Sequence, residues 1–417
     1  MILRSKLFKN IGLLVGGTAI AQAITFFATL YLTTIYSPDS FGLLSLGTSI
    51  ISLLVPLTTL RYDKAIVLAK DEKETNGLIT ISFFIAILFF ASLLIVALIV
   101  YLCDLIKNKN HYILLILVPV GVLLFGFMNV FQMYFEKKSR FKITSSVAVI
   151  DAVSKVSFQY SLNSILPTLG MFVGYIVALT INTVFYFVKS KELFKQRFFE
   201  IEKEYLFKIA KKYNKFPKYF TWSNIIDSAS QNVCSLTFPF LFSLGILGNF
   251  SIAYKIVRLP ALLISMATRR TYYPKAVALY AINKSQFKVF YTKASLTLIA
   301  ISIIPVLIFQ LYAEELFGLF FNPEWQPAAK YAKIILWYVF ANFCNSLAHE
   351  NMIIFGLQKL FLIIEVIWFL LSLLLIYIAF LLGKPFLAVI FYALSGVFME
   401  VLVFIIQYKK GFKATTN

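Results

Sequence analysis

Charged side chains are scarce in this sequence of 417 residues. Only 14% of the residues are Asp, Glu, Lys or Arg, and the chain has two histidines and three cysteines. A soluble domain usually has about 25% charged residues, so this composition excludes a soluble globular protein. Cys103, Cys234 and Cys344 are an odd number and lie in or beside apolar runs. They therefore predict neither a disulfide framework nor a metal site.

Apolar residues fill most of the chain instead. They make up 60% of the sequence, and the mean hydropathy is +0.83. A helix needs about 20 apolar residues to cross a bilayer. Apolar windows predict about twelve such spans, of which those at 143–162 and 219–242 carry many polar residues. The sequence therefore predicts an all-α integral membrane protein with about twelve transmembrane helices.

The basic residues between the spans predict the orientation of the chain. The net charge is +20, and the loops that alternate along the chain place 31 Lys and Arg on one side against five on the other. Such an excess marks the cytoplasmic side, so both termini are expected in the cytoplasm. Because the cations sit in short clusters between apolar segments, they indicate contact with anionic lipids and exclude a nucleic-acid partner.

A weak internal repeat divides the chain into halves. Gly42 and Ser45 in the second span correspond to Gly248 and Ser251 in the eighth, an offset of about half the chain. Two six-helix bundles are expected at residues 1–188 and 219–417. A basic linker, 189–218, is expected to form an amphipathic helix on the cytoplasmic membrane face. Some transporters built from parallel repeats bind their substrate between the halves.

Two cations inside the eighth span, 247–267, are the main candidates for substrate binding. A cation at the centre of a bilayer costs at least about 2.5 kcal/mol, and Lys255 and Arg258 share one face of a helix beside Pro260. The fork-shaped guanidinium of Arg258 suits the oxygens of a diphosphate. The alternative is that carboxylates on neighbouring helices neutralise both cations.

Three further cations are candidates for substrate binding. Arg61 and Arg269 end the second and eighth spans and occupy corresponding places in the repeat. Cations at such helix ends more often reflect topology or lipid contact. Lys155 lies in the fifth span, four residues after Asp151, so the two side chains are expected to neutralise each other within one helix.

Acidic residues inside the spans are candidates for coupling transport to an ion. Glu350, Asp227 and Glu365 could take up a proton or a sodium ion, or could balance Lys255 and Arg258. No other cofactor and no metal is expected. Glu400 lies near the inner end of the last span and is interpreted as interfacial.

Several stretches in the chain resemble polysaccharide-biosynthesis flippases of the Wzx type. The resemblance rests on "YSPDSFGLLSL" with "LRYDKAIVLAKD", on "LGNFSIAYKIVRLPALLISMATRRTYYPKAV" and on "FGLFFNPEWQPAAKYAKIILWYV". It implies a fold like that of multidrug and toxin extruders (MATE-like), with two bundles around a central cavity that opens alternately to each side. It also implies an undecaprenyl-diphosphate-linked oligosaccharide, of O-antigen or capsule type, moved to the outer leaflet of the bacterial cytoplasmic membrane. Membrane lipids and other polysaccharide assembly proteins are the expected partners.

Two other functions compete with a flippase. A membrane glycosyl polymerase would be an enzyme with a sizeable outer domain, whereas the longest predicted outer loop has about twenty residues and no nucleophile or phosphate-binding motif is present. An enzyme is therefore not expected. A cation-coupled multidrug extruder of the same fold is the nearer alternative, but its cavity should show acids unmatched by bases.

Overall fold

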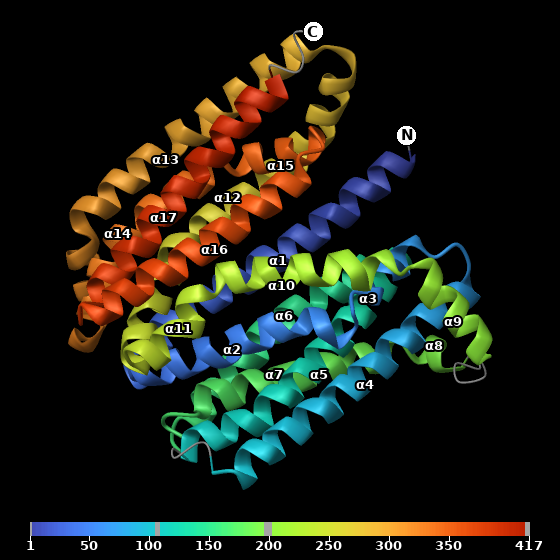
Figure 1. The fold of residues 1–417 in the computed structure, drawn as a ribbon, viewed down its shortest axis with the longest axis horizontal. Coiled ribbons are helices and arrows are strands. Elements are labelled where there is room, and N and C mark those ends of the chain that lie inside the picture. The colour runs from blue at the N-terminus through green and yellow to red at the C-terminus, as the bar shows by residue number, and fades with distance from the viewer. Residues whose placement is uncertain (1, 105–108, 196–201, 413–417) are drawn as a thin grey trace. The chain divides into compact units, whose positions relative to one another are not determined.

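The computed structural model describes residues 2–104, 109–195 and 202–412, and these residues form helices without a single strand (Figure 1). The predicted all-α class is confirmed. The chain divides into two compact units, one of Met1–Tyr36 with Leu43–Ser228 and one of Ser37–Gly42 with Ala229–Asn417. The linker thus falls within the first unit, and the grouping of spans six and six stays a prediction.

The first unit is a bundle of long helices with short helices at the predicted cytoplasmic end. Neighbouring helices pack in pairs, notably α6 against α1 and α7, and α5 against α4 and α7. In chain order the elements are α1 (Ile2–Ile35), α2 (Pro38–Thr58), α3 (Tyr62–Ala65), η1 (Ile66–Leu68), α4 (Glu72–Leu102), α5 (Lys109–Lys137), α6 (Phe141–Leu162), α7 (Gly170–Lys189), α8 (Lys191–Lys195), α9 (Lys203–Lys212), η2 (Phe216–Phe220) and α10 (Thr221–Gln231).

The second unit is a bundle around α14, which packs against α12, α13 and α17. The first residues of α2 and the last of α10 also belong to this unit. Its other elements are α11 (Val233–Leu241), α12 (Leu244–Ile282), α13 (Lys284–Phe320), η3 (Pro323–Trp325), α14 (Gln326–Cys344), α15 (Ser346–Ile354), α16 (Gln358–Leu381), α17 (Pro385–Ile406) and η4 (Gln407–Phe412).

Nine helices in the described ranges are long and apolar enough to cross a membrane by themselves. The three other predicted spans are helical but polar or interrupted. Helix α6 carries the Asp151–Lys155 pair, the span at 219–242 is divided into α10 and α11 at Asn232, and the span at 334–355 is divided into α14 and α15 at Asn345. Interrupted helices occur at membrane depth where protein surrounds the break.

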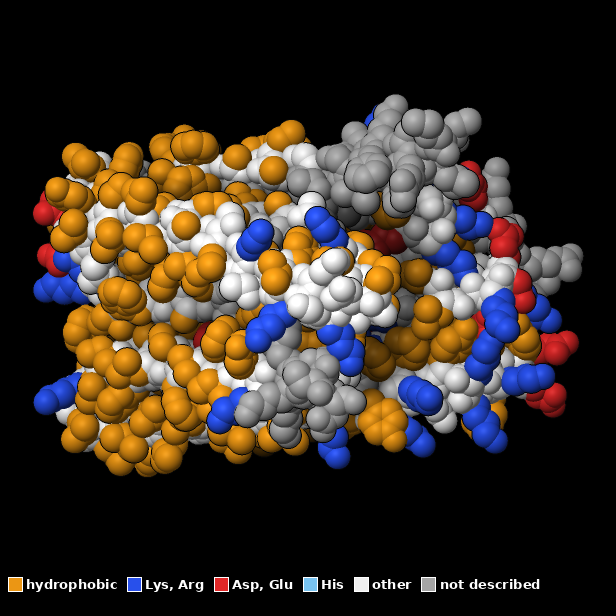
Figure 2. All heavy atoms as spheres, turned by 90° about the horizontal axis from the view of Figure 1, so that it is seen from above, with side chains coloured by type: hydrophobic (Ala, Val, Ile, Leu, Met, Phe, Trp, Pro, Cys, Tyr) orange, Lys and Arg blue, Asp and Glu red, His pale blue; other side chains and the backbone are white. Residues whose placement is uncertain are grey.

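Large apolar side chains are exposed along several of the long helices. Large exposed apolar residues line α4, α13 and α16, and Figure 2 shows such side chains over one part of the visible face, with Lys and Arg gathered elsewhere. In water such patches would cause aggregation, but they match the hydrocarbon of a bilayer. The surface therefore supports the membrane assignment.

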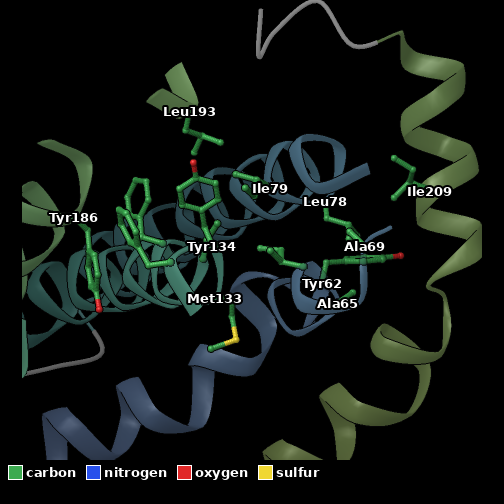
Figure 3. Close-up of a cluster of buried hydrophobic side chains, with 14 of the residues drawn as sticks. Tyr62, Ala65, Ala69, Leu78, Ile79, Met133, Tyr134, Tyr186, Leu193 and Ile209 are labelled. Atoms are coloured by element: carbon green, nitrogen blue, oxygen red, sulfur yellow. The ribbon is translucent and has the colours of Figure 1, made fainter. Parts of the chain in front are cut away.

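The linker helix α9 binds the first unit through its apolar face. Ile209 is 3% exposed and lies with Tyr62, Ala69 and Leu78 in one buried cluster (Figure 3). Lys212 forms an ion pair with Glu74 at the start of α4. An amphipathic helix buries its apolar face on whichever apolar surface is available. The prediction that this face lies on the membrane is therefore wrong for α9, while residues 196–201 lie outside the described part.

The repeated glycines mark a close helix crossing inside the second unit. A Cβ atom on Gly42 would overlap the carbonyl of Leu244, and one on Gly248 would overlap the carbonyl of Pro38. The first turns of α2 and α12 thus touch through their backbones at both repeat-related positions. Only glycine permits so close an approach.

Helices α12 and α13 form a hairpin that is longer than a bilayer is thick. They have 39 and 37 residues and meet at Asn283. At 1.5 Å per residue α12 extends over 50 Å, and the part of α13 before its kink at Tyr312 extends ~42 Å, whereas the hydrocarbon is ~30 Å thick. A buried aromatic cluster that includes Tyr272, Phe287 and Tyr291 holds the basic end of the hairpin together.

Candidate functional site

A partly open polar pocket lies in the second unit between α12 and α14. Its cavity has a volume of about 120 Å³, which is below the ~300–1,000 Å³ of typical small-molecule sites. Its walls carry two guanidinium groups, aromatic rings and a carboxamide, from Arg258, Arg269, Tyr254, Tyr338 and Asn342. Both arginines lie on α12, eleven positions or ~16 Å apart along the helix axis, so they line the pocket from one face of the same helix.

Arg258 is held in this pocket by its own helix and by α10. Its guanidinium carbon lies 5.2 Å from the centre of the Tyr254 ring, one turn earlier on α12. Its Nη2 lies 3.5 Å from Oε1 of Gln231. A guanidinium beside an aromatic face is held in a fixed orientation by this contact. The helix α12 continues through Pro260, which does not end it.

Arg269, which lines this pocket, lies close to Glu350 of α15. The Nε of Arg269 is 3.8 Å from Oε1 of Glu350, too far for a hydrogen bond, and this buried Nε has no hydrogen-bond partner among the described residues. The sequence hypothesis assigned these two residues to separate roles, substrate binding and ion coupling. The structure places them in one electrostatic pair across α12 and α15.

A buried carboxylate, Glu400, adjoins the pocket through Asn342. Glu400 is 3% exposed, so its interpretation as an interfacial residue is wrong. Its carboxylate accepts hydrogen bonds from Asn342 at 2.6 Å and Asn345 at 2.8 Å, and it lies 2.9 Å from Nε2 of His349. A buried carboxylate needs several donors because water cannot reach it. The spacing of Asn342, Asn345 and His349 was the available sequence signal, since these polar residues mark one face of an apolar span.

The remaining candidates of the second unit lie beside this pocket rather than on its walls. Lys255 is half-buried on α12, three residues before Arg258, and is not among the residues that line the pocket. Glu365 is half-buried on α16, where its backbone carbonyl accepts a hydrogen bond from Ser230. The pocket therefore favours Arg258 and Arg269 over Lys255 as anion ligands.

In the first unit, Arg61 is held between the end of α2 and α10. Leu60 and Arg61 have positive φ angles of 46° and 60°, a left-handed conformation that is uncommon outside glycine. The Nη2 of Arg61 donates to Oδ1 of Asn224 at 2.7 Å. Burial lowers the pKa of Arg61, and the carboxylates of Asp63 and Asp227 oppose that shift. The strained turn thus directs a charged guanidinium toward α10.

Lys155 forms the predicted pair within α6. Its Nζ lies 2.7 Å from Oδ2 of Asp151, and Asn182 on α7 donates to the other carboxylate oxygen at 2.7 Å. The ammonium also lies 5.2 Å from the centre of the Tyr175 ring. These contacts neutralise Lys155 inside the first unit.

The described residues offer no cluster of three or more His, Cys, Asp or Glu side chains that could hold a metal ion. Within the same ranges Cys103, Cys234 and Cys344 are free thiols, and Cys103 is exposed at the end of α4.

Solved transporters share the fold of this chain. An inward-facing multidrug resistance MATE family transporter of the MOP superfamily superposes with a TM-score of 0.71 at 13% identity, covering 95% of this chain and 96% of that chain. A MOP superfamily transporter from Pyrococcus furiosus, reported with a reversed polarity of its binding pocket, gives 0.63 at 13% identity, covering 98% and 96%. At this identity the likeness defines the fold class, that of the MATE-like membrane transporters.

A family model completes the assignment. The model described as polysaccharide biosynthesis protein matches residues 31–330. The chain belongs to this polysaccharide biosynthesis family. No curated protein matches the chain. The predicted membership in a polysaccharide-biosynthesis family, the all-α multi-pass membrane class and the MATE-like fold are thereby confirmed.

Proposed function

We propose that this protein is a flippase for undecaprenyl-diphosphate-linked oligosaccharides of O-antigen or capsule type. It would carry them from the inner to the outer leaflet of the bacterial cytoplasmic membrane by alternating access. The family match supports a role in polysaccharide biosynthesis, and the fold supports transport. Beyond these two findings, the proposal names an anionic, lipid-linked substrate and the bacterial cytoplasmic membrane.

The observation that carries the proposal is the pair of guanidinium groups on the polar pocket of the second unit. Arg258 and Arg269 line one hollow, and Arg258 lies beside an aromatic ring. A diphosphate offers negative charge and oxygens spaced for such forks. A multidrug extruder for organic cations is less well supported, since its substrate would meet these cations first.

Replacing Arg258 by alanine should slow leaflet exchange of an undecaprenyl-diphosphate-linked oligosaccharide by about tenfold or more. The loss of a desolvated, charge-assisted contact removes more than about 1.4 kcal/mol, which is tenfold in an equilibrium constant. Arg258→Lys should be intermediate because an ammonium keeps the charge but not the fork. Exchange is measured in liposomes that contain the purified protein and a labelled substrate.

The control for this experiment is Lys384→Ala, which removes an exposed cation between α16 and α17. It should leave exchange unchanged. Equal exchange by wild type and Arg258→Ala would contradict the proposed site. Export of organic cations by the wild type, without exchange of the lipid-linked sugar, would favour the multidrug extruder.

We further propose that a proton or a sodium ion drives the cycle through Glu350, Asp227 and Glu365. Glu350 lies beside Arg269, and Asp227 acts on Arg61, so protonation of either acid changes the charge next to a candidate substrate ligand. Glu350→Gln combined with Asp227→Asn should abolish exchange driven by an imposed proton or sodium gradient. Exchange without a gradient should persist. Undiminished gradient-driven exchange in the double variant would disprove the coupling role.

A further inference from the structure

An apolar groove lies in the second unit between α12, α13 and α14. Its cavity has a volume of about 170 Å³, and its lining includes Pro260 and Ile264 of α12, Ile301 and Val306 of α13, and Phe340 of α14. Small residues on facing helices, among them Ala261, Ser302 and Pro305, leave the space that larger side chains would fill. The groove is therefore formed by the sequence of three helices rather than by a loop.

The groove adjoins the polar pocket. Ala261, Val339 and Phe343 line both hollows, so the two sites share one wall formed by α12 and α14. One hollow carries Arg258 and Arg269, whereas the other is almost entirely apolar. Ala261 is the smallest side chain of the shared wall. An adjoining cationic site and apolar site match an amphiphile with an anionic head and a hydrocarbon tail.

We propose that this groove binds the first isoprenoid units of the substrate's polyprenyl tail while the diphosphate occupies the polar pocket. This inference rests on the proposed function and adds the place of the tail, which bulk lipid would otherwise surround. Because lipid is as apolar as the groove, the groove contributes packing and orientation rather than a hydrophobic transfer energy. By binding the carbons next to the diphosphate, the groove keeps the diphosphate beside Arg258.

The groove is tested by filling it and by replacing the isoprenoid tail with an unbranched one. Val306→Trp places an indole in the groove, and Leu307→Trp places the same indole on the neighbouring exposed position of α13, which is 53% exposed. Both variants are reconstituted with two substrates that carry the same diphospho-oligosaccharide, one on an undecaprenyl chain and one on an unbranched saturated chain that has no isoprenoid units. Val306→Trp should lower the preference for the undecaprenyl substrate by about fivefold, the effect of one lost packing contact. Leu307→Trp should preserve it.

Three outcomes would overturn the groove. The first is that Val306→Trp and Leu307→Trp change the exchange of the two substrates equally. The second is that Val306→Trp slows the exchange of both substrates by the same factor. The third is that the wild type exchanges both substrates at the same rate. If the wild type moves neither substrate, the proposed function fails instead. A second measurement then still tests the groove without any variant. An undecaprenyl diphosphate with a photoreactive group near its head should label the α13 peptide that contains Ile301 and Val306. Label spread evenly over the lipid-exposed helices would contradict the groove, as expected for an ordinary lipid contact.

Discussion

Replacing Gly248 by alanine should lower the free energy of unfolding of the second unit by about 3 kcal/mol. Added atoms in a packed interior usually cost about 1–3 kcal/mol, and this methyl group would overlap a backbone carbonyl, that of Pro38, which cannot rotate away. The gain of about 1 kcal/mol from replacing a helical glycine would not offset the overlap. Thermal unfolding of the detergent-solubilised protein measures the effect as a lower melting temperature.

Two further glycine variants, one at the repeat-related position and one at an uncrowded position, test the same explanation. Gly42→Ala should destabilise by a similar amount, because its methyl group would overlap the carbonyl of Leu244. Gly16→Ala is the matched control, since nothing lies within 4 Å of the new Cβ and the residue is helical. A Gly248→Ala protein as stable as Gly16→Ala would show that the two helices separate readily, contrary to the structure.

Replacing Glu400 by leucine should destabilise the second unit by about 3 kcal/mol. The change removes the acceptor of two asparagine amides and the partner of His349, and it leaves these groups buried. Breaking one side of a buried pair costs about 3–5 kcal/mol in soluble proteins, and somewhat less between membrane helices. The melting temperature should fall, and Arg258-dependent exchange should fall with it because Asn342 lines the polar pocket.

Glu400→Gln separates charge from hydrogen bonding. It keeps one acceptor oxygen and the side-chain volume, so its stability should lie between those of the wild type and Glu400→Leu. Glu324→Leu, at an exposed position in η3, is the surface control and should not change the melting temperature. Equal stability of Glu400→Leu and the wild type would mean that water, rather than the asparagines, solvates this carboxylate.

The elements that depend on local pattern were predictable from the sequence. Apolar runs of sufficient length predict spanning helices, and the four-residue spacing of Asp151 and Lys155 predicts their pair on one helix. The repeat of Gly42 and Gly248 was visible as well, but the close contact between α2 and α12 at these glycines was not predictable. A close backbone crossing depends on what the opposite helix presents, and one sequence position does not contain that information.

The errors came from contacts between segments distant in the chain. Arg269 and Glu350 are separated by 81 positions, so their pairing could not be read from spacing. Glu400 was interpreted as interfacial from its place in the last span, but three side chains of α14 and α15 surround it. The apolar face of α9 was visible in the sequence. The sequence does not show whether this face packs on lipid or on apolar side chains such as Leu78, because both surfaces are apolar. In each case the environment of the residue depends on a segment that is distant in the sequence.

The long hairpin of α12 and α13 has a practical consequence for imaging. A membrane protein of 47.5 kDa offers few features outside a detergent micelle, which hampers the alignment of single particles. Here two helices joined through Asn283 extend beyond the hydrocarbon, and Ile282 at the tip is 84% exposed. A rigid helical protein inserted at this tip, in continuous register with both helices, would serve as a fiducial marker. Because the insertion is far along the hairpin from Arg258, the fusion should retain leaflet exchange.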